Sequence, residues 1–518
     1  MGSEQPHTHL SNRPNTSGRG LWLGVFVIFV LLYALTCQRS FPWQDSGIRA
    51  WQVVQFDLYG LGKAQGLAVA HPGYVVLAQI CRLLPRQWIP AGINFFSGLG
   101  MAIALANLAA VTALLTGRRW AGLAAAGMLG VAHTVWWLST IAEAYTWSVA
   151  GLTAELWLLV VLLRRPTWGK LVALALISGL GLCVHNFALL PLPVYVVAAV
   201  VLVVRRRLPA WALGAAAGAW VLGAGLYLGM TIELAVREGF IAAIGSALVG
   251  GYGREALNIG DASSRAKENA AIAAMNFASL LVPLAVVGWW RLRRWAGGPT
   301  ALAIAAITII EVLFVVRYPV PDQFMFLLPS LVMMALAAGV GAATLAQRSS
   351  AWRRVAAVAC VVSILLPPAI YAIAPSVVGR TDIGRRSAER SSHRDELRYW
   401  LTPWKHNENS AQAFAEAALA QARPDGVILP DSTSKYVLML VQQWGDGLGD
   451  GVSIQHDGRP LPPYGQQTRS DYLAILAGRP LYVVKADPDH VSAALLDDTR
   501  IIEPAKDQVL NRLEWRQP

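Results

Sequence analysis

Residues 21–36 read LWLGVFVIFVLLYALT and contain no charged side chain. A run of this length and composition predicts a helix that spans a membrane. No small-residue cleavage site follows it, so we interpret it as an uncleaved anchor and not as a signal peptide. Comparable apolar runs recur along the 518 residues, separated by short basic clusters. This pattern predicts a polytopic α-helical membrane protein.

The composition supports the same class. Hydrophobic residues make up 55% of the chain and charged residues only 14%, whereas soluble proteins carry about 25% charged residues. The net charge of +12 could indicate a nucleic-acid partner. However, the arginines gather in short connections between apolar segments, as topology signals do. We therefore expect membrane lipids, and no nucleic acid, as partners.

The apolar runs predict about eleven transmembrane helices. Basic clusters occupy every second connection, so the positive-inside rule places the N-terminus in the cytoplasm and the C-terminus outside, in a membrane expected to be the bacterial inner (plasma) membrane. Two shorter segments, 46–59 and 71–84, are predicted to lie on the outer membrane face. The predicted spans are 20–37, 92–116, 120–137, 142–163, 169–184, 187–205, 209–229, 270–291, 299–317, 323–346 and 352–374.

The chain divides into three predicted parts by polarity. Residues 1–19 resemble a disordered cytoplasmic tail, 20–374 form the transmembrane domain, and 375–518 form a small α/β domain outside the membrane. The transmembrane domain includes a first outer loop, 38–91, and a long outer loop, 230–269. In the polar domain, strands are predicted at 426–431, 480–486 and 499–506, and helices at 410–423, 434–444 and 488–496.

Polar residues that membrane segments usually avoid gather at the predicted outer ends of the spans. Their placement predicts a polar cleft on that face. A carboxylate there can act as a general base, and His or Arg can neutralise a phosphate leaving group. An activated donor outside the cell would be attached to lipid, and on composition alone a transporter fits nearly as well. The residues are Asp45, Asp57, His71, His133, Glu143, Tyr145, His185, Asn186, Arg317 and Asp322.

The four cysteines, Cys37, Cys81, Cys183 and Cys360, lie in or beside apolar segments. No CxxC or Cys/His spacing is present, so a metal site has no support. We interpret them as buried apolar residues. A Cys37–Cys81 disulfide outside the membrane is an alternative.

Several short motifs resemble a known family. They are WQDSG at 43–47, AHPGY at 70–74, AEAY at 142–145 and PDQFMFLLPS at 321–330, followed by KHNENSAQAFAEAALAQARPDGVILPDS at 405–432. In this order they resemble the GT-C superfamily of membrane glycosyltransferases, and within it the protein O-mannosyltransferase-like group that includes a vertebrate transmembrane O-mannosyltransferase. Two positions depart from the family pattern. Ile48 replaces a family Glu, and a second Pro is missing between Pro72 and Gly73.

The resemblance implies an inverting glycosyltransferase that moves a sugar from a polyprenyl-phosphate donor to a hydroxyl on a protein, glycan or lipid acceptor. Asp45 would be the general base. His71, His185 and Arg317 would contact the donor phosphate. Since the phosphate is the leaving group, no soluble cofactor is expected. The other candidate substrate-binding residues are Ser46, Tyr74, Glu143, Tyr145, Asn186 and Asp322.

Ordinary structural roles compete with these assignments. Asp45 or Ser46 could cap the helix that follows, and Glu143 could favour a helix dipole. Asn186 could form a turn, and Arg317 could extend to the membrane surface. The alternative function is a transporter or flippase that moves a lipid-linked or anionic solute through the same cleft. Transporters often show two related halves, and the sequence has no visible internal repeat.

Overall fold

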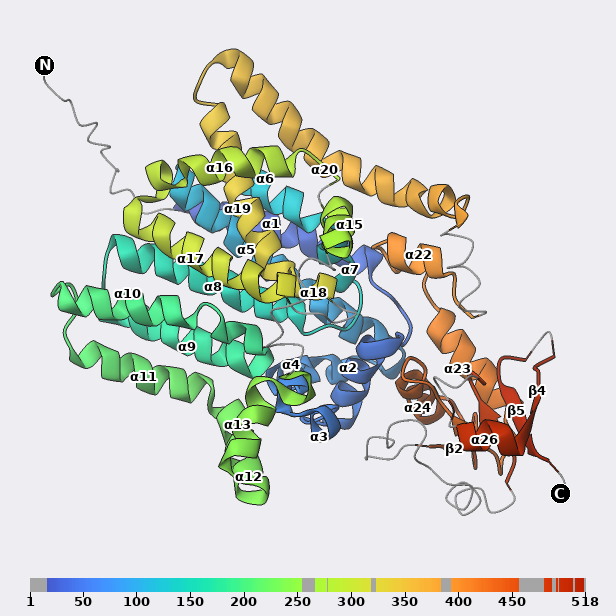
Figure 1. The fold of residues 1–518 in the computed structure, drawn as a ribbon. Helices are drawn as coiled ribbons and strands as arrows, with labels where there is room; N and C mark the ends of the chain where they lie inside the picture. The colour runs from blue at the N-terminus through green and yellow to red at the C-terminus, as the bar shows by residue number, and fades with distance from the viewer. Residues whose placement is uncertain are drawn as a thin grey trace, which may run out of the picture.

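Long apolar helices make up most of the molecule, a computed structural model (Figure 1). Among the residues that the structure describes, seven helical segments are long and apolar enough to cross a membrane, and each coincides with a predicted span. The chain is therefore an integral membrane protein. The structure describes residues 16–253, 266–276, 278–317, 323–382, 393–455, 479–486, 491, 493–505 and 508–516. The seven segments are Gly18–Thr36, Arg86–Thr116, Tyr145–Arg164, Asn186–Val204, Gly298–Val316, Leu328–Leu345 and Ser350–Val378.

The other four predicted spans are broken or short. Helices α11 (Trp211–Gly223) and α12 (Gly225–Glu238) meet at 72°, and Ala270–Asn276 meets α16 (Leu281–Ala296) at 97°. The span predicted at 120–137 is divided into α6 (Arg119–Gly130) and α7 (His133–Leu138), and α9 (Trp168–Val184) has only 17 residues. The remaining long helices are α1 (Thr16–Thr36), α5 (Ile89–Thr116), α8 (Tyr145–Arg164), α10 (Leu192–Val204), α15 (Ala266–Asn276), α17 (Gly298–Arg317), α19 (Leu328–Leu345) and α20 (Ser350–Val378).

Helices α5 and α19 form the centre of the bundle. The apolar window of α19 is 89% buried, that of α5 is 72% buried, and that of α1 is only 17% buried. Small residues let the central helices approach each other closely, as is common in membranes. A Cβ atom at Gly288 of α16 would lie 1.7 Å from the Ala337 carbonyl oxygen of α19. Any larger residue at Gly288 would therefore separate these two helices.

Short helices cover one end of the bundle (Figure 1). Two of them occupy the segments predicted as outer-face helices, namely α2 (Gln44–Gln55) and α4 (Pro72–Ala78) with its continuation η2 (Gln79–Leu83). Much of the segment expected as a long loop, 230–269, is helical, and its residues 254–265 lie outside the described part. The other short elements are α3 (Gly62–Gln65), η1 (Leu67–Val69), η3 (Arg86–Trp88), η4 (Asn186–Leu189), α13 (Phe240–Leu248), η5 (Gly250–Tyr252) and α18 (Gln323–Phe326).

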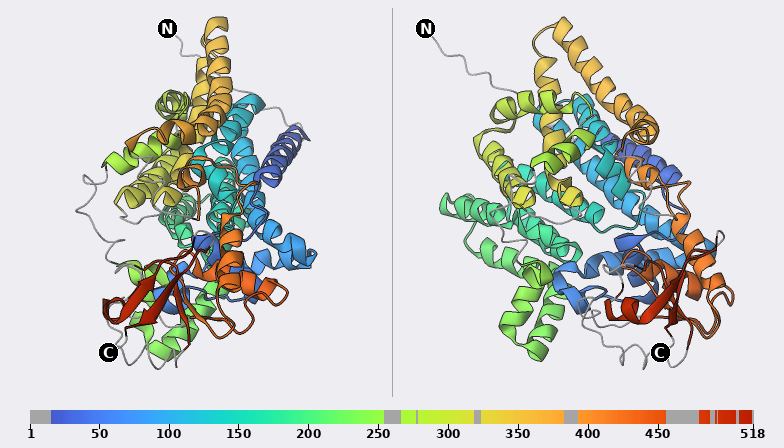
Figure 2. Two further views of the ribbon diagram at one scale, coloured as in Figure 1. Left: turned by 90° about the vertical axis from the view of Figure 1, so that its right-hand side faces the viewer. Right: turned by 45° about the vertical axis from the view of Figure 1, so that its right-hand side comes forward.

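A small mixed sheet follows α20 and α22 (Glu396–Leu401), and it lies at the same end of the bundle as α2 and α3 in every view (Figures 1 and 2). Its strand order is β2-β1-β3-β5-β4, with β1 parallel to β2 and β3, and β5 antiparallel to β3 and β4. The elements are α23 (Ser410–Gln421), β1 (Val427–Leu429), α24 (Lys435–Trp444), β2 (Ser453–Ile454), β3 (Leu481–Val483), α26 (Ala493–Asp498), β4 (Thr499–Ile502) and β5 (Asn511–Trp515).

The N-terminal tail and the cysteines were the subject of two further predictions. The predicted tail lies mostly outside the described residues, and α1 already begins at Thr16. All four cysteines are buried and free, so the alternative of a Cys37–Cys81 disulfide is not observed.

Candidate functional site

Helix α2 carries charged and polar side chains on one face, because Asp45, Arg49 and Gln52 recur at a spacing of one helical turn. Asp45 lies in the first turn. The N-cap is Trp43, and no side chain caps this helix, so neither Asp45 nor Ser46 has the capping role considered above. Burial raises the pKa of Asp45, and the nearby Arg49 charge opposes that shift. A carboxyl group with a raised pKa is suited to accept a proton near neutral pH.

Glu143 is bonded directly to α2. Its Oε1 accepts a 2.7 Å hydrogen bond from the Ser46 hydroxyl, and both residues are buried. On the other side, the Glu143 backbone N–H donates to Ser97 Oγ of α5 at 2.7 Å. A hydrogen bond between a hydroxyl and a carboxylate is stronger than one between neutral groups. The Ser46–Glu143 contact therefore fixes the start of α2, with Asp45, against the segment just before α8.

Three aromatic side chains from different segments meet beside this contact. The rings of His71 and His185 stack with centroids 4.7 Å apart, and the Tyr145 ring lies 4.9 Å from that of His185. His71 Nδ1 donates to the Val184 carbonyl at 2.9 Å, whereas His185 Nδ1 accepts from the Phe187 N–H at 3.1 Å. In the neutral rings, His71 Nε2 is then an acceptor and His185 Nε2–H a donor.

Burial, together with the charge of Arg49, lowers the pKa of both histidines, that of His185 to about 3. Both rings are therefore neutral at neutral pH in the protein without ligand. His185 can donate a hydrogen bond to an anion but supplies no charge of its own. A cation for an anionic ligand must come from another residue.

The AHPGY motif positions His71. His71 has a left-handed backbone with φ +52° and is the N-cap of α4, and Pro72 follows at the first helical position. A Cβ atom at Gly73 would lie 2.8 Å from the Cys183 carbonyl carbon, so glycine lets α4 approach α9 closely enough for the His71–Val184 bond. Tyr74 is fully buried beside Phe96. Its hydroxyl has no hydrogen-bond partner among the described residues.

Arg49 is a site residue that the sequence reasoning missed. It is only 5% exposed, and its guanidinium donates to Gln52 Oε1 and to the Val69 carbonyl at 3.3 Å. It forms no ion pair with any residue that the structure describes. Its charge acts on Asp45, His71 and His185. A buried cation without a carboxylate partner is suited to bind an anionic ligand.

Among the remaining predicted residues, Asn186 and Asp57 bond to other segments. The Asn186 amide donates to the carbonyls of Ala247 and Leu248, which attaches η4 to α13. Asp57 forms a 3.1 Å ion pair with Lys63. Arg317 ends α17, and its side chain lies outside the described part, as does the whole of Asp322.

His133 is buried in α7 with its ring 5.1 Å from that of Tyr371, and neither ring nitrogen has a hydrogen-bond partner among the described residues. No group of three or more His, Cys, Asp or Glu side chains in the described part of the chain could hold a metal ion.

The α/β domain contacts the segment that carries Asp45. The Trp43 indole N–H donates to Ser410 Oγ at 2.8 Å, and the Gln44 N–H donates to the Thr433 carbonyl at 3.0 Å. The Trp51 ring of α2 lies 6.5 Å from the Tyr436 ring of α24. Asp45 therefore lies where the transmembrane helices meet the C-terminal domain, so a ligand from the lipid and one from the water could meet there.

Comparisons with known proteins agree with this architecture. No protein-family model and no curated protein sequence matches the chain. Among solved structures, ArnT from Cupriavidus metallidurans is similar in its apo state (TM-score 0.59, 14% identity) and bound to undecaprenyl phosphate (TM-score 0.57, 13% identity). Both comparisons cover 96% of this chain and 98% of ArnT. The archaeal oligosaccharyltransferase AglB from Archaeoglobus fulgidus has a TM-score of 0.48 at 11% identity, covering 90% of this chain and 70% of AglB. The likeness to ArnT shows that the chain has the GT-C fold, as predicted.

Proposed function

We propose that this protein is an inverting glycosyltransferase that moves a sugar from a polyprenyl-phosphate donor to an acceptor hydroxyl. Transfer takes place at the end of the bundle that carries the α/β domain, on the outer face of a bacterial inner membrane. The similar ArnT structure is bound to undecaprenyl phosphate, which supports a lipid-phosphate donor. The observation that carries the proposal is Arg49, a buried cation without an ion-pair partner among the described residues, close enough to act on Asp45, His71 and His185.

Asp45 is the general base in this proposal. It removes the proton from the acceptor hydroxyl, whose oxygen attacks the anomeric carbon from the face opposite the phosphate. The bond between that carbon and the phosphate oxygen breaks, and the electron pair leaves with the polyprenyl phosphate. Because the base and the leaving group act on opposite faces, the configuration at the sugar carbon inverts. Glu143 accepts a hydrogen bond from Ser46 and is therefore a positioning residue that holds the start of α2.

Arg49 and His185 would stabilise the departing phosphate. The guanidinium supplies the positive charge, and His185 Nε2–H supplies a hydrogen bond whose direction is fixed by the Phe187 N–H on the other ring nitrogen. His71 stacks on His185 and orients it. Arg49 thus takes a role that the sequence assigned to Arg317. No soluble cofactor is required, since the reaction uses the energy of the phosphate–sugar bond.

The acceptor would approach from the aqueous side, between α2 and the α/β domain. Trp43, Gln44 and Trp51 all contact that domain. A shift of the domain would therefore move the segment that carries Asp45. The resemblance of the AHPGY and AEAY motifs to the O-mannosyltransferase-like group makes a mannosyl donor the first to test. A protein, a glycan and a lipid are the acceptor classes to compare.

A transfer assay tests the proposal. Purified protein is incubated with radiolabelled polyprenyl-phosphate sugars, including the mannosyl donor, and with membrane extract as the acceptor source. We expect label in a product only when the protein and one matching donor are both present. If no donor yields a product, while the protein moves labelled polyprenyl phosphate between the leaflets of a vesicle, the chain is a flippase and the proposal is wrong.

A further inference from the structure

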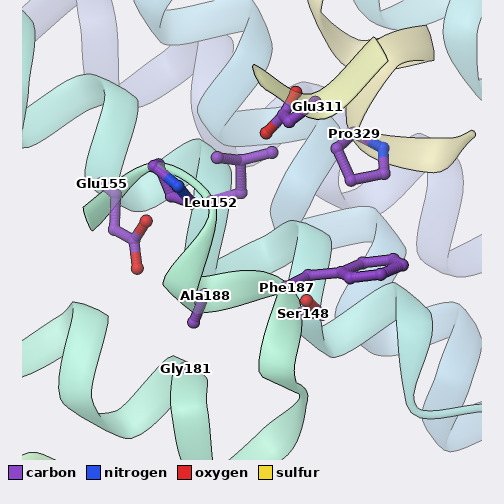
Figure 3. Close-up of a pocket in the computed structure, with 9 residues that line it drawn as sticks. Ser148, Leu152, Glu155, Gly181, Phe187, Ala188, Glu311 and Pro329 are labelled. Atoms are coloured by element: carbon purple, nitrogen blue, oxygen red, sulfur yellow. The ribbon is translucent and has the colours of Figure 1, made fainter. Parts of the chain in front are cut away.

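A second polar site lies inside the transmembrane domain, away from Asp45. Two carboxylates, Glu155 of α8 and Glu311 of α17, line one pocket between the helices (Figure 3). The pocket has an empty volume of about 280 Å³ including its mouth. Its other lining residues are Ser148, Leu152, Gly181, Phe187, Ala188, Pro191 and Pro329. The two carboxylates have no part in the transfer mechanism above, although Phe187 of this pocket also bonds His185 through its N–H.

Neither carboxylate is neutralised by a cation among the described residues. Both are 1% exposed. Glu155 Oε2 accepts a 2.8 Å hydrogen bond from the Tyr195 hydroxyl of α10, whereas Glu311 Oε2 is buried without a described partner. Glu155, Glu311 and Tyr195 are the titratable groups at this pocket whose charges act on one another, and the lining residues from α9, η4 and α19 carry no charge.

Two negative charges in one buried pocket are strongly unfavourable. Each carboxylate loses its hydration, and the two repel each other in a medium of low dielectric constant. Intramembrane acids usually face a partner or an ion pathway. Since the described lining supplies no positive charge, we assign that charge to a ligand. We propose that the pocket lined by Glu155 and Glu311 is a binding site for one small monovalent cation, either a proton or a sodium ion.

The walls of the pocket favour a small ligand over an organic cation. A Cβ atom at Gly181 would lie 3.4 Å from Glu155 Oε1 and 3.1 Å from the Ala188 methyl group, so the helices around Glu155 are closely packed. The Tyr195 hydroxyl adds a neutral oxygen atom beside Glu155, and oxygen atoms are the ligands that hard cations prefer.

The test measures thermal unfolding of the purified full-length protein between about pH 6 and about pH 9. Wild type is compared with Glu311→Gln, which keeps the shape of the side chain but removes one charge. Exposed Glu238, at the end of α12, supplies the control Glu238→Gln. Each sample is measured in sodium chloride and in choline chloride. Glu155→Gln is the second variant in case Glu311→Gln does not fold.

The two cations give different results. For a proton, the unfolding midpoint of wild type falls as the pH rises, in either salt, because deprotonation leaves both carboxylates charged. For sodium, the midpoint at high pH is higher in sodium chloride than in choline chloride. In both cases the Glu311→Gln or Glu155→Gln variant loses this dependence of the unfolding midpoint on pH or sodium, and Glu238→Gln keeps it.

The proposal is overturned if wild type and the folded Glu311→Gln or Glu155→Gln variants respond identically to pH and to sodium. If neither pocket variant folds, the infrared spectrum of the wild-type protein is measured instead. The absence of a protonated-carboxyl band, together with no response of the unfolding midpoint to sodium, overturns the proposal.

Discussion

We expect Arg49→Gln to weaken ligand binding strongly while it changes the free energy of unfolding only a little. Arg49 donates hydrogen bonds to Gln52 and Val69 and forms no ion pair in the described structure. Its loss removes these two bonds but also a buried charge that is costly to keep. We therefore expect the free energy of unfolding without ligand to change by no more than about 2 kcal/mol. A chemical denaturation series measures this change.

Binding of the lipid phosphate should change much more. A hydrogen bond to a charged group contributes about 1.5–3 kcal/mol. At about 1.4 kcal/mol per tenfold, Arg49→Gln weakens binding of polyprenyl phosphate by about 10- to 150-fold. Calorimetric titration of the purified protein measures the dissociation constant. Arg82→Gln is the control, because Arg82 is an exposed arginine in η2 and its guanidinium donates to Gln79.

Two results would show that Arg49 does not bind the lipid phosphate. One is a folded Arg49→Gln protein that binds polyprenyl phosphate within twofold of wild type. The other is an equal loss of affinity in Arg82→Gln, which would show that the surface charge attracts the lipid and the buried guanidinium does not. Either result removes Arg49 from the phosphate site.

Three further substitutions are tested by thermal or chemical unfolding: two concern the supports of the site, and the third concerns the buried Lys405. Ser46→Ala removes the 2.7 Å bond to buried Glu143 and should cost about 1–3 kcal/mol. Gly73→Ala places a methyl group 2.8 Å from the Cys183 carbonyl carbon, and the overpacking should cost about 1–3 kcal/mol, whereas equal stability would contradict the close approach. Burial lowers the pKa of Lys405 to about 7, below the unfolded value of about 10.4, so the unfolded chain binds more protons between these values. The stability of wild type relative to Lys405→Met should then rise from about pH 7 to about pH 10, and a flat difference would contradict the buried charge.

Hydropathy predicted most of the bundle because lipid leaves a chain few alternatives to apolar helices. Seven predicted spans are continuous helices. The bend between α11 and α12 was not predicted, although Gly223 and Gly225 flank it and weaken the helix there. Strands β2 and β5 were also missed. Strand β2 has only two residues, and it is ordered by pairing with β1, so its own sequence carries little signal.

The candidate site was predicted in part. Unusual polar residues at the ends of spans identified Asp45, His71, Glu143, Tyr145 and His185, and the structure places them around the junction of α2, α4 and α8. Arg49 was missed because a single arginine in a polar helix is ordinary. Its burial depends on contacts with distant segments, which a pattern in one sequence does not reveal.

Asp45 is the proposed base for sugar transfer, and a comparison of three proteins tests this role. Wild type, Asp45→Asn and the control Asp57→Asn are assayed for transfer from the matching polyprenyl-phosphate sugar, with folding checked by thermal unfolding. Asp57 is an acid of the same outer segment whose side chain forms an ion pair with Lys63. We expect Asp45→Asn to fold, to bind the donor and to lose transfer, whereas Asp57→Asn retains it. Transfer at the wild-type rate by folded Asp45→Asn would show that Asp45 is not the base.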